Sequence, residues 1–443
     1  MIKPKVVLMC GGIGKRMSPI TMDKALFKFR GKTLVDHQIN SAKEAGISQF
    51  IIIANPENIN DIQSSLSEID NVKIDFALQK EPHGMADALL STSKLIGIDP
   101  FILVSSNDIF EKSAYIELLR EYQKNNDYAV YITARQVKNH FPGGYLKVNK
   151  YNEIGHIIEK PPKGEEPSNL INIVIHLHAQ PEKLLNYLAS TRSSADDIYE
   201  KALDRMISDN YKMKAVIYHG AWQAIKYPWH ILEAMDFFQK QFTQQISSSS
   251  HISDKSVIGD GVIIEDNARI LEGAVIRGSS YIGRNTIVGN SALIRDSIIG
   301  DDCVIGYGTE IKHSYIGNKC WFHSNYIGDS VIESDCSFGA GAVTANFRLD
   351  ESNISVKIGN DKIDTGTDKL GAIIGKGCRI GIHTSIMPGI RIGANSFIGA
   401  HVYLVNDVEP NKKVLAESHY RTLANDSSIS YNKRDKLIEK LTR

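Results

Sequence analysis

A repeat of six residues in the second half of the chain constrains its fold more than any other feature. Aliphatic residues recur at every sixth position from Ile258 to Ile294, and the series resumes from Ile374 to Leu404. This spacing predicts a solenoid in which each unit forms one short strand, with its aliphatic side chain filling the axis. Three units would close one triangular coil, so we expect residues 251–415 to form a parallel β-helix.

The repeat is interrupted within this region. Its register slips near Ile316–Phe338, and it is broken by Val343–Ala372, a polar segment that is too long for a turn between two coils. Loops that leave a rigid scaffold often carry functional residues. We therefore expect this segment to project from the solenoid and to contribute to a site.

The first part of the chain follows a different pattern. Apolar runs such as Lys5–Cys10 and Phe50–Ala54 alternate with amphipathic stretches such as Leu34–Ala45. This alternation predicts strands joined by helices, and hence a doubly wound, Rossmann-like α/β domain over residues 1–245.

Two segments flank the expected solenoid. The serine run Ser247–Ser250 is expected to be a linker between the two domains. Residues 416–443 are expected to form a C-terminal tail, either as a terminal helix or as a frayed arm.

Composition excludes several classes of function. The chain has 51 basic and 51 acidic residues, which argues against a large basic surface for nucleic acid. No apolar run approaches the roughly 18 residues of a membrane helix, and the N-terminus lacks a signal-peptide pattern. We therefore expect a cytoplasmic protein with neither membrane nor nucleic acid as partner. The five cysteines form no CxxC pair and are expected to be reduced packing residues.

A glycine-rich segment follows the first expected strand. Its backbone N–H groups can surround a phosphate, and Arg16 adds positive charge, although a glycine loop alone also fits an ordinary tight turn. Further motifs follow in the order Lys24, Gln79–Ala86, Asn107-Asp108 and Glu159-Lys160-Pro161.

In this order the motifs resemble those of the sugar-1-phosphate nucleotidylyltransferase family, whose pattern is LAAGxGTRxxPxT…PK, QxxPxGTA, a strand ending in GD, and VEKP. The resemblance covers about residues 4–240. It implies that a sugar-phosphate oxygen attacks the α-phosphorus of a nucleoside triphosphate and that pyrophosphate leaves. The implied residues are the catalytic Arg16 and Lys24 with Gly11, Gly12 and Gly14 for the phosphates, Gln79 and Gly84 for the base, Gly144, Glu159 and Asn172 for the sugar, and Asp108 for Mg²⁺.

The sequence departs from this family pattern at Trp222–Lys226. The family commonly reads W-x-D-I-G there, and its aspartate is a second metal ligand, whereas this chain has Ala224. Because alanine cannot bind a metal, we expect nucleotidyl transfer to be slow or absent while binding of the nucleoside triphosphate persists. Gly11, Asp23 and Met85 also replace a usual alanine, proline and threonine.

A second group of motifs lies on the expected solenoid. His323 and Tyr326 belong to the sequence H-S-N-Y-I-G-D, which is followed by G-A-G, by Asn346 and, after the long loop, by Lys369. A lone histidine in a β-helix is more often structural. This order, however, closely resembles the acetyltransferase half of the bifunctional enzyme family that makes UDP-N-acetylglucosamine, and still more its archaeal relatives. The resemblance covers about residues 255–410.

This resemblance implies a left-handed β-helix, a homotrimer with acetyl-CoA bound between subunits, and acetyl transfer to glucosamine-1-phosphate or a related amino sugar phosphate. His323 would be the base that frees the lone pair of the amine. Arg295 lies one residue out of register with a phosphate-binding arginine, and Ile382 replaces a serine. The other implied contacts are Lys312, Tyr326, Asn346 and Lys369 to the substrate and Ala400 to acetyl-CoA.

The sequence therefore favours a bifunctional enzyme of nucleotide-sugar synthesis. The base stays open, since Gln79 suggests uracil or thymine, with UTP or dTTP favoured, whereas Gly11-Gly12 also occurs in guanylyltransferases. One alternative is a regulatory subunit. The nucleotide-exchange subunits of eukaryotic translation initiation also join a degenerate nucleotidylyltransferase-like domain to a hexapeptide solenoid. Another is a transferase whose solenoid serves only for oligomerisation.

Overall fold

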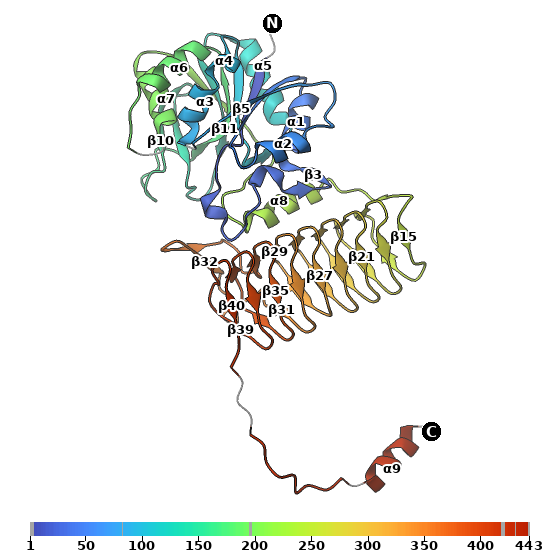
Figure 1. The fold of residues 1–443 in the computed structure, drawn as a ribbon. Coiled ribbons are helices and arrows are strands. Elements are labelled where there is room, and N and C mark those ends of the chain that lie inside the picture. Colours follow the sequence, from blue (N-terminus) through green and yellow to red (C-terminus); the bar gives the residue numbers. More distant parts are fainter. Residues whose placement is uncertain (1–3, 82, 195–196, 418–420, 430, 442–443) are drawn as a thin grey trace.

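The computed structural model shows two units, an α/β domain and a solenoid that lies along its lower side (Figure 1). The structure describes residues 4–81, 83–194, 197–417, 421–429 and 431–441. Both expected folds are confirmed, the first as a Rossmann-like domain and the second as a left-handed parallel β-helix.

A nine-stranded mixed sheet forms the centre of the first domain in the described residues. Its central strands β5, β4, β1 and β6 are parallel, and β11 is antiparallel to β6 and β8. The strands are β1 (Lys5–Met9), β4 (Gln49–Ala54), β5 (Lys73–Leu78), β6 (Phe101–Ser105), β8 (Val130–Gln136), β9 (Gly144–Val148), β10 (Ile154–Glu159), β11 (Leu170–His178) and β12 (Met213–Ile217).

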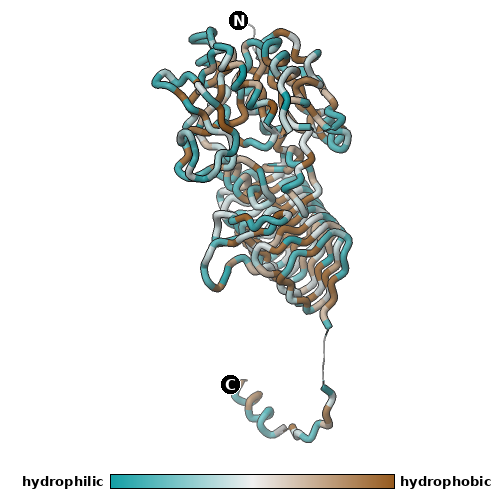
Figure 2. The backbone as a smooth tube through the Cα atoms, turned by 90° about the vertical axis from the view of Figure 1, so that its left-hand side faces the viewer, coloured by the Kyte–Doolittle hydropathy of each residue, from teal (hydrophilic) through white to brown (hydrophobic). Residues whose placement is uncertain are grey.

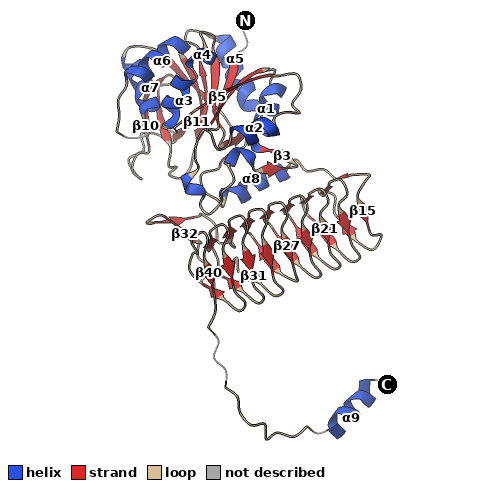
Figure 3. Cartoon of the chain, in the orientation of Figure 1, coloured by secondary structure: helices blue, strands red, loops and turns tan. Residues whose placement is uncertain are grey.

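Helices cover both faces of this sheet (Figure 3). Alternate residues of one strand face opposite sides, so Val6 packs under α1, α2 and α5, whereas Val7 packs under α3, α4, α6 and α7. Sequence reasoning predicted several of these elements but missed β9 and β12. The helices are α1 (Leu34–Glu44), α2 (Ile59–Ser65), α3 (Gly84–Ser91), α4 (Ser93–Ile96), α5 (Ser113–Lys124), α6 (Pro181–Ser190), α7 (Ile198–Ser208) and α8 (His230–Gln239).

Short elements that follow the central strands β1 and β6 carry many of the expected site residues. Strand β7 (Asp108–Phe110) pairs with β13 (Trp222–Ala224). Two 3₁₀ turns, η1 (Lys15–Met17) and η2 (Lys24–Leu26), follow β1, and a small hairpin is formed by β2 (Lys28–Phe29) and β3 (Lys32–Thr33).

The solenoid has three parallel sheets in the described residues, one for each side of its triangular coil. Nearly every short strand turns one aliphatic or aromatic side chain inward, and these side chains stack along the axis. The strand Val343–Thr344 turns Thr344 inward instead. The brown segments in Figure 2 recur from coil to coil. Coils between β20 (Tyr281–Ile282) and β29 (Val331–Ile332) are shorter than those before them, which explains the slip in register that the sequence shows.

The side that faces the α/β domain is called the docking face, and its strands are β14 (Gln245–Ile246), β17 (Ile263–Ile264), β20 (Tyr281–Ile282), β23 (Ile298–Ile299), β26 (Tyr315–Ile316), β29 (Val331–Ile332), β34 (Ile373–Ile374) and β37 (Arg391–Ile392). The second side consists of β15 (His251–Ile252), β18 (Arg269–Ile270), β21 (Ile287–Val288), β24 (Val304–Ile305), β27 (Trp321–Phe322), β30 (Ser337–Phe338), β35 (Arg379–Ile380), β38 (Phe397–Ile398) and β40 (Lys413–Val414). The third consists of β16 (Val257–Ile258), β19 (Val275–Arg277), β22 (Leu293–Arg295), β25 (Glu310–Lys312), β28 (Tyr326–Gly328), β31 (Val343–Thr344), β36 (Ser385–Ile386) and β39 (Tyr403–Leu404).

The predicted linker is part of the solenoid. Strand β14 already pairs with β17, and the amide of Ser250 donates to the carbonyl of Ser247, so Ser247–Ser250 forms the first corner of the first coil. The coil pattern therefore begins at Gln245, and the prediction of a serine linker is wrong because serines fit a solenoid corner as well as a flexible connection.

The α/β domain packs on the docking face through apolar contacts. Tyr281, Ile298 and Tyr315 point outward from their strands and are buried in one cluster with residues of η1, β2 and α8. The rings of Phe27 and Tyr315 lie 5.3 Å apart between centroids. A fully buried side chain of this size contributes about 1.5–3 kcal/mol, so the two units form a substantial interface.

The long segment after β31 projects from the solenoid, as the sequence predicts. It forms a hairpin of β32 (Ser355–Ile358) and β33 (Asp361–Asp364), and the buried Ile354 and Val356 join the domain interface. In the tail, α9 (Tyr431–Leu441) lies away from the solenoid. Across the described ranges, no helix combines the length and apolarity needed to span a membrane. All five cysteines are buried and free, as expected.

Two candidate active sites

The glycine-rich loop lies against the expected base-reading residues. A Cβ atom at Gly11 would overlap the Oε1 atom of Gln79, so the loop and this side chain are in close contact. The Nε2 atom of Gln79 donates to the carbonyl of Gly84 at 3.2 Å and to Oδ2 of Asp87 at 2.8 Å. The structure thus brings Gly11, Gln79 and Gly84 together at the end of β1.

Asn58 holds the loop between β1 and η2 in place. Its Nδ2 atom donates to the carbonyl of Cys10 at 2.7 Å and to Oδ2 of Asp23 at 2.8 Å. The other oxygen of Asp23 accepts the backbone N–H of Ala25 and caps the turn that carries Lys24. Asp23 can therefore replace the family's proline, since it fixes the same turn by hydrogen bonds.

Asp108 is a buried carboxylate that is surrounded by cations. Its Oδ1 atom accepts a hydrogen bond of 2.9 Å from Nε1 of Trp222. Burial raises the pKa of Asp108 to about 6, although the hydrogen bond from Trp222 and the charges of Lys226 and Lys24 oppose this rise. Burial also lowers the pKa of Lys24 to about 8, and the charge of Arg16 acts on the same ammonium group.

The residues around Asp108 do not complete a metal centre by themselves. Ala224 is the register partner of Asp108 in the β7–β13 pair and offers no oxygen from its side chain. Within the described ranges, no three histidine, cysteine or carboxylate side chains converge closely enough to hold a metal ion. The protein alone therefore supplies one carboxylate beside two lysines, a set that favours an anion over a cation.

The expected sugar-binding residues also lie together. A Cβ atom at Gly144 would lie 2.7 Å from Oδ1 of Asn172 and 2.9 Å from Oε2 of Glu159, so both side chains occupy the space that glycine leaves. Glu159 also pairs with Lys160 at 3.1 Å. His176 and His178 pack in the core, and both contact the hydroxyl of Tyr199.

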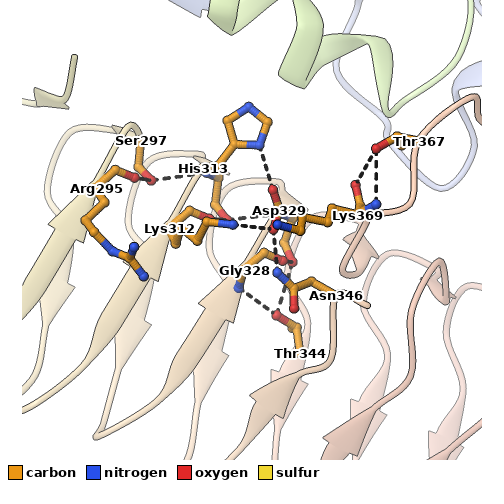
Figure 4. A network of polar contacts seen from close by, with 12 residues as sticks. Arg295, Ser297, Lys312, His313, Gly328, Asp329, Thr344, Asn346, Thr367 and Lys369 are labelled. Carbon is orange, nitrogen blue, oxygen red and sulfur yellow. Dashed lines mark hydrogen bonds and ion pairs between the residues drawn. The ribbon is translucent and has the colours of Figure 1, made fainter. Parts of the chain in front are cut away.

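On the solenoid, Asp329 is the centre of a polar network (Figure 4). It lies at the corner between β28 and β29 and is almost fully buried. Its Oδ2 atom lies 3.3 Å from Nζ of Lys312 and accepts the side-chain amide of Asn346. The side chain of Lys369, from the end of the long loop, points toward the same carboxylate in Figure 4.

Gly328 leaves room for two of the expected substrate contacts. A Cβ atom at this position would lie 2.8 Å from Nδ2 of Asn346 and 2.8 Å from the hydroxyl of Tyr326. The structure thus brings Lys312, Tyr326 and Asn346 to one corner of the solenoid, under the start and end of the long loop, where Phe347 and Lys369 form an antiparallel bridge.

His313 connects this network to the α/β domain. Its Nδ1 atom lies 2.8 Å from Oδ1 of Asp329, and its Nε2 atom lies 3.0 Å from Oδ1 of Asp236 on α8. Burial lowers the pKa of His313, but hydrogen bonds to the two carboxylates outweigh burial and raise it to about 9. The side chain of Arg295 is paired with Glu310 on the neighbouring strand.

His323 lies at the opposite end of β28 from this network, at the corner that follows β27. Its side chain is exposed, and its backbone N–H donates to Oδ1 of Asn325 at 2.6 Å. The corners with Ile382 and Ala400 follow in later coils on the same edge. The structure therefore places His323 and Ala400 along one edge and the substrate-binding set along the next, with the Tyr326 strand between them.

Sequence reasoning missed the residues that join the two halves. Glu333 accepts the backbone N–H groups of Thr21, Met22 and Lys376 at 2.9–3.0 Å and the hydroxyl of Thr21 at 2.6 Å. It forms one wall of a cavity of about 360 Å³ that also includes Gly12, Gly14 and Lys24. The signal in the sequence was a carboxylate after Ile332, at the position where the neighbouring coils have Gly317 and Gly375.

Comparisons with known proteins agree with this architecture. Residues 5–241 match the nucleotidyl transferase family, residues 242–343 match the GMPPB C-terminal domain, and residues 371–406 match six repeats of the bacterial transferase hexapeptide. The chain belongs to the nucleotidyl transferase family, in its bifunctional archaeal branch that carries hexapeptide repeats.

Two archaeal relatives match this chain over nearly its whole length. "Bifunctional protein GlmU" of Methanococcus maripaludis strain C7 is 36% identical, over 92% of this chain and 96% of that protein. "Bifunctional sugar-1-phosphate nucleotidylyltransferase/acetyltransferase" of Sulfurisphaera tokodaii is 30% identical, over 91% and 98%. A solved UDP-glucose pyrophosphorylase in complex with UDP-glucose covers 54% of this chain and 100% of its own, at 21% identity and a TM-score of 0.49.

Proposed function

We propose that the solenoid transfers an acetyl group from acetyl-CoA to the amine of glucosamine-1-phosphate or a related amino sugar phosphate. The observation that carries this proposal is the polar corner around Asp329, where Lys312, Tyr326 and Asn346 converge beneath Lys369. A solenoid that served only as a scaffold would need no such set at one corner.

The residues divide the chemistry among them. Lys312 and Lys369 would bind the phosphate by charge, and Tyr326 and Asn346 would orient the sugar. An amine is mostly an ammonium ion at neutral pH, so a base must remove a proton before the lone pair can attack the thioester. His323 would be this base, and acetyl-CoA would lie along the edge from His323 to Ala400. The attack is direct, so no acyl-enzyme forms.

The same proposal assigns nucleotidyl transfer to the α/β domain. Gly11, Gly12, Gly14, Arg16 and Lys24 would bind the triphosphate, Gln79 and Gly84 would read uracil or thymine, and Gly144, Glu159 and Asn172 would bind the sugar. The convergence of these residues at the ends of β1, β5 and β9 supports the assignment. Mg²⁺ would enter with the nucleoside triphosphate, and Asp108 would be its contact on the protein. Because Ala224 stands where the family has its second metal ligand, the rate of nucleotidyl transfer should be low.

The assembly belongs to the proposal as well. We propose a homotrimer in the cytoplasm, where acetyl-CoA and nucleoside triphosphates are available. The docking face is covered by the α/β domain, which leaves the other two sides of the solenoid for contacts between subunits. Light scattering on the full chain should give three times the monomer mass, and a monomer would contradict this part of the proposal.

One set of assays tests the function. Purified protein is given amino sugar phosphates with acetyl-CoA, and separately sugar-1-phosphates with UTP, dTTP or GTP, while free thiol and pyrophosphate are measured. Thiol release that depends on an amino sugar phosphate supports acetyl transfer. Pyrophosphate release without thiol release would favour a solenoid that only oligomerises. Absence of both would favour the regulatory-subunit alternative, which Ala224 supports.

A further inference from the structure

Two positions of the β13 segment differ from the family pattern in a related way. Where the pattern reads aspartate and then glycine two residues later, this chain has Ala224 and Lys226. The first change removes a negative charge, and the second adds a positive one. Together they change the charge beside Asp108 by two units in the same direction.

The ammonium group of Lys226 lies between the two halves of the nucleotide-sugar site. Ala224 pairs with Asp108, and the charge of Lys226, two residues further on, acts on both Asp108 and Glu159. Asp108 belongs to the triphosphate side of the site, whereas Glu159 belongs to the sugar side. The Nζ atom of Lys226 lies 3.9 Å from a Cβ atom built at Gly143, the residue before Gly144 on the sugar side.

The surroundings of Lys226 hold it in this place. Its Nζ atom donates to the carbonyl of Pro142 at 2.7 Å and lies 3.8 Å from the centroid of the Phe141 ring. Phe141 in turn packs edge-on against Trp222, with centroids 5.3 Å apart. A side chain at Gly143 would lie 2.6 Å from the Phe141 ring, so glycine is needed for this arrangement.

The charges that act on Lys226 come from several elements. They are the cations Arg16 and Lys160 and the carboxylates Asp108 and Glu159. Lys24 lies on the other side of Ile225, whose carbonyl it reaches at 3.4 Å. Lys24 and Lys226 therefore both act on the single carboxylate of Asp108, and Arg16 acts on both lysines. This excess of positive charge suits a polyanion.

We propose that Lys226 is a catalytic residue that contacts the transferring phosphoryl group and supplies the positive charge that the family obtains from a metal ion on its second carboxylate. This inference rests on the proposed nucleotidyl transfer. The sugar-phosphate oxygen forms the new bond to the α-phosphorus, the bond to the β-phosphate oxygen breaks, and pyrophosphate leaves with the electron pair. Lys226 keeps its proton throughout and donates hydrogen bonds to the phosphate oxygens.

Nucleotide binding without metal tests the proposal. Calorimetry with UTP and dTTP in the presence of EDTA is performed on the full chain, on Lys226→Ala and on Lys212→Ala, a control at an exposed lysine of the same domain. We expect the unaltered chain to bind, and Lys226→Ala to bind about tenfold to a hundredfold more weakly, as for the loss of a charged hydrogen bond. Lys212→Ala should bind as the unaltered chain does.

A reciprocal variant gives a second measurement. Ala224→Asp combined with Lys226→Gly restores the family pair, and we expect this variant to bind Mn²⁺, seen by electron paramagnetic resonance, more tightly than the unaltered chain. The role of Lys226 would be overturned if Lys226→Ala bound UTP and dTTP as tightly as the unaltered chain does. It would also be overturned if the double variant bound Mn²⁺ no more tightly than the unaltered chain. A folded chain that binds no UTP, dTTP or GTP, even with Mg²⁺, would overturn the proposed nucleotidyl transfer as well.

Discussion

The Nε2 atom of His313 lies 3.0 Å from Oδ1 of Asp236, so one imidazole joins the solenoid to helix α8 of the α/β domain. The other ring nitrogen contacts Asp329, which also holds Lys312 and Asn346. His313 therefore connects the contact between domains to the proposed acetyl-transfer site, and a change in domain position would alter the substrate-binding corner.

The charge of His313 should make this contact sensitive to pH. The carboxylates raise its pKa to about 9 in the folded chain, above the usual value of 6.5. Because folding raises this pKa, the protonated imidazole stabilises the fold fully below pH 6.5, and this stabilisation is lost as the pH rises through about 9. Thermal unfolding followed from pH 6 to 10 should therefore show a larger fall in Tm for the unaltered chain than for His313→Gln.

The difference should be small, since pairs of this exposure contribute up to about 1 kcal/mol, or about 2–4 °C in Tm for a domain of this size. Parallel curves for the two proteins would show that His313 does not carry the charge. Other groups titrate in the same range, so only the difference between the two proteins is informative.

Glu333 should support nucleotide binding from the solenoid. Its carboxylate accepts four hydrogen bonds, three of them from Thr21 and Met22 in the loop before Lys24. Glu333→Gln places an amide N–H group against these donors, and we expect unfolding free energy to fall by about 2 kcal/mol and UTP affinity to fall with it. Denaturant titration and calorimetry would measure the two effects, with the exposed Glu272→Gln as control. Unchanged UTP affinity would show that the loop does not need the solenoid.

The sequence predicts the inside of each domain better than the contact between them. The six-residue repeat identifies the inward residues, because each of them must fill the axis of the coil. Outward residues follow no such rule, yet Tyr281, Ile298 and Tyr315 are apolar on one side of successive coils. This pattern marks a covered face, and sequence reasoning did not use it.

The site residues show the same division. Motifs identified Gly11, Gln79 and Asn346, since each belongs to a local pattern of residues. Lys226 stands where a family motif has glycine and Glu333 lies outside the motifs, so the importance of both depends on contacts with segments far away in the chain. Such contacts depend on how the domains and loops pack, which periodicity and spacing do not specify.

Two glycines allow the two proposed reactions to be impaired separately. An alanine Cβ at Gly144 would press on Asn172 and Glu159, and one at Gly328 would press on Asn346 and Tyr326. In both cases the atoms in the way are the ends of side chains, which can move at little cost to folding. Gly144→Ala should therefore weaken nucleotidyl transfer and leave acetyl transfer intact, and Gly328→Ala should do the opposite.

Each variant is the control for the other, and a solenoid variant at Gly259, where a Cβ atom would meet nothing closer than 3.4 Å, controls for folding. Measured sugar-phosphate affinity should fall at least tenfold in the affected reaction. Loss of both reactions in either variant would mean that the two sites depend on each other more closely than their residues indicate.

His323 is the residue on which acetyl transfer should depend most. It is exposed at the corner between β27 and β28, on the edge that leads to Ala400, and histidine is a base near neutral pH. His323→Ala removes the base but leaves the backbone hydrogen bond to Asn325, so the coil should keep its shape. General bases contribute about 10²–10⁴-fold, and we expect thiol release from acetyl-CoA to fall by that factor while the KM for the amino sugar phosphate changes little. Activity of the variant should recover in part at high pH, where free amine becomes abundant without a base. A variant that keeps more than about a tenth of the rate at neutral pH would exclude His323 as the base, and would direct attention to the other edge of the strand, where Tyr326 lies beside Asn346.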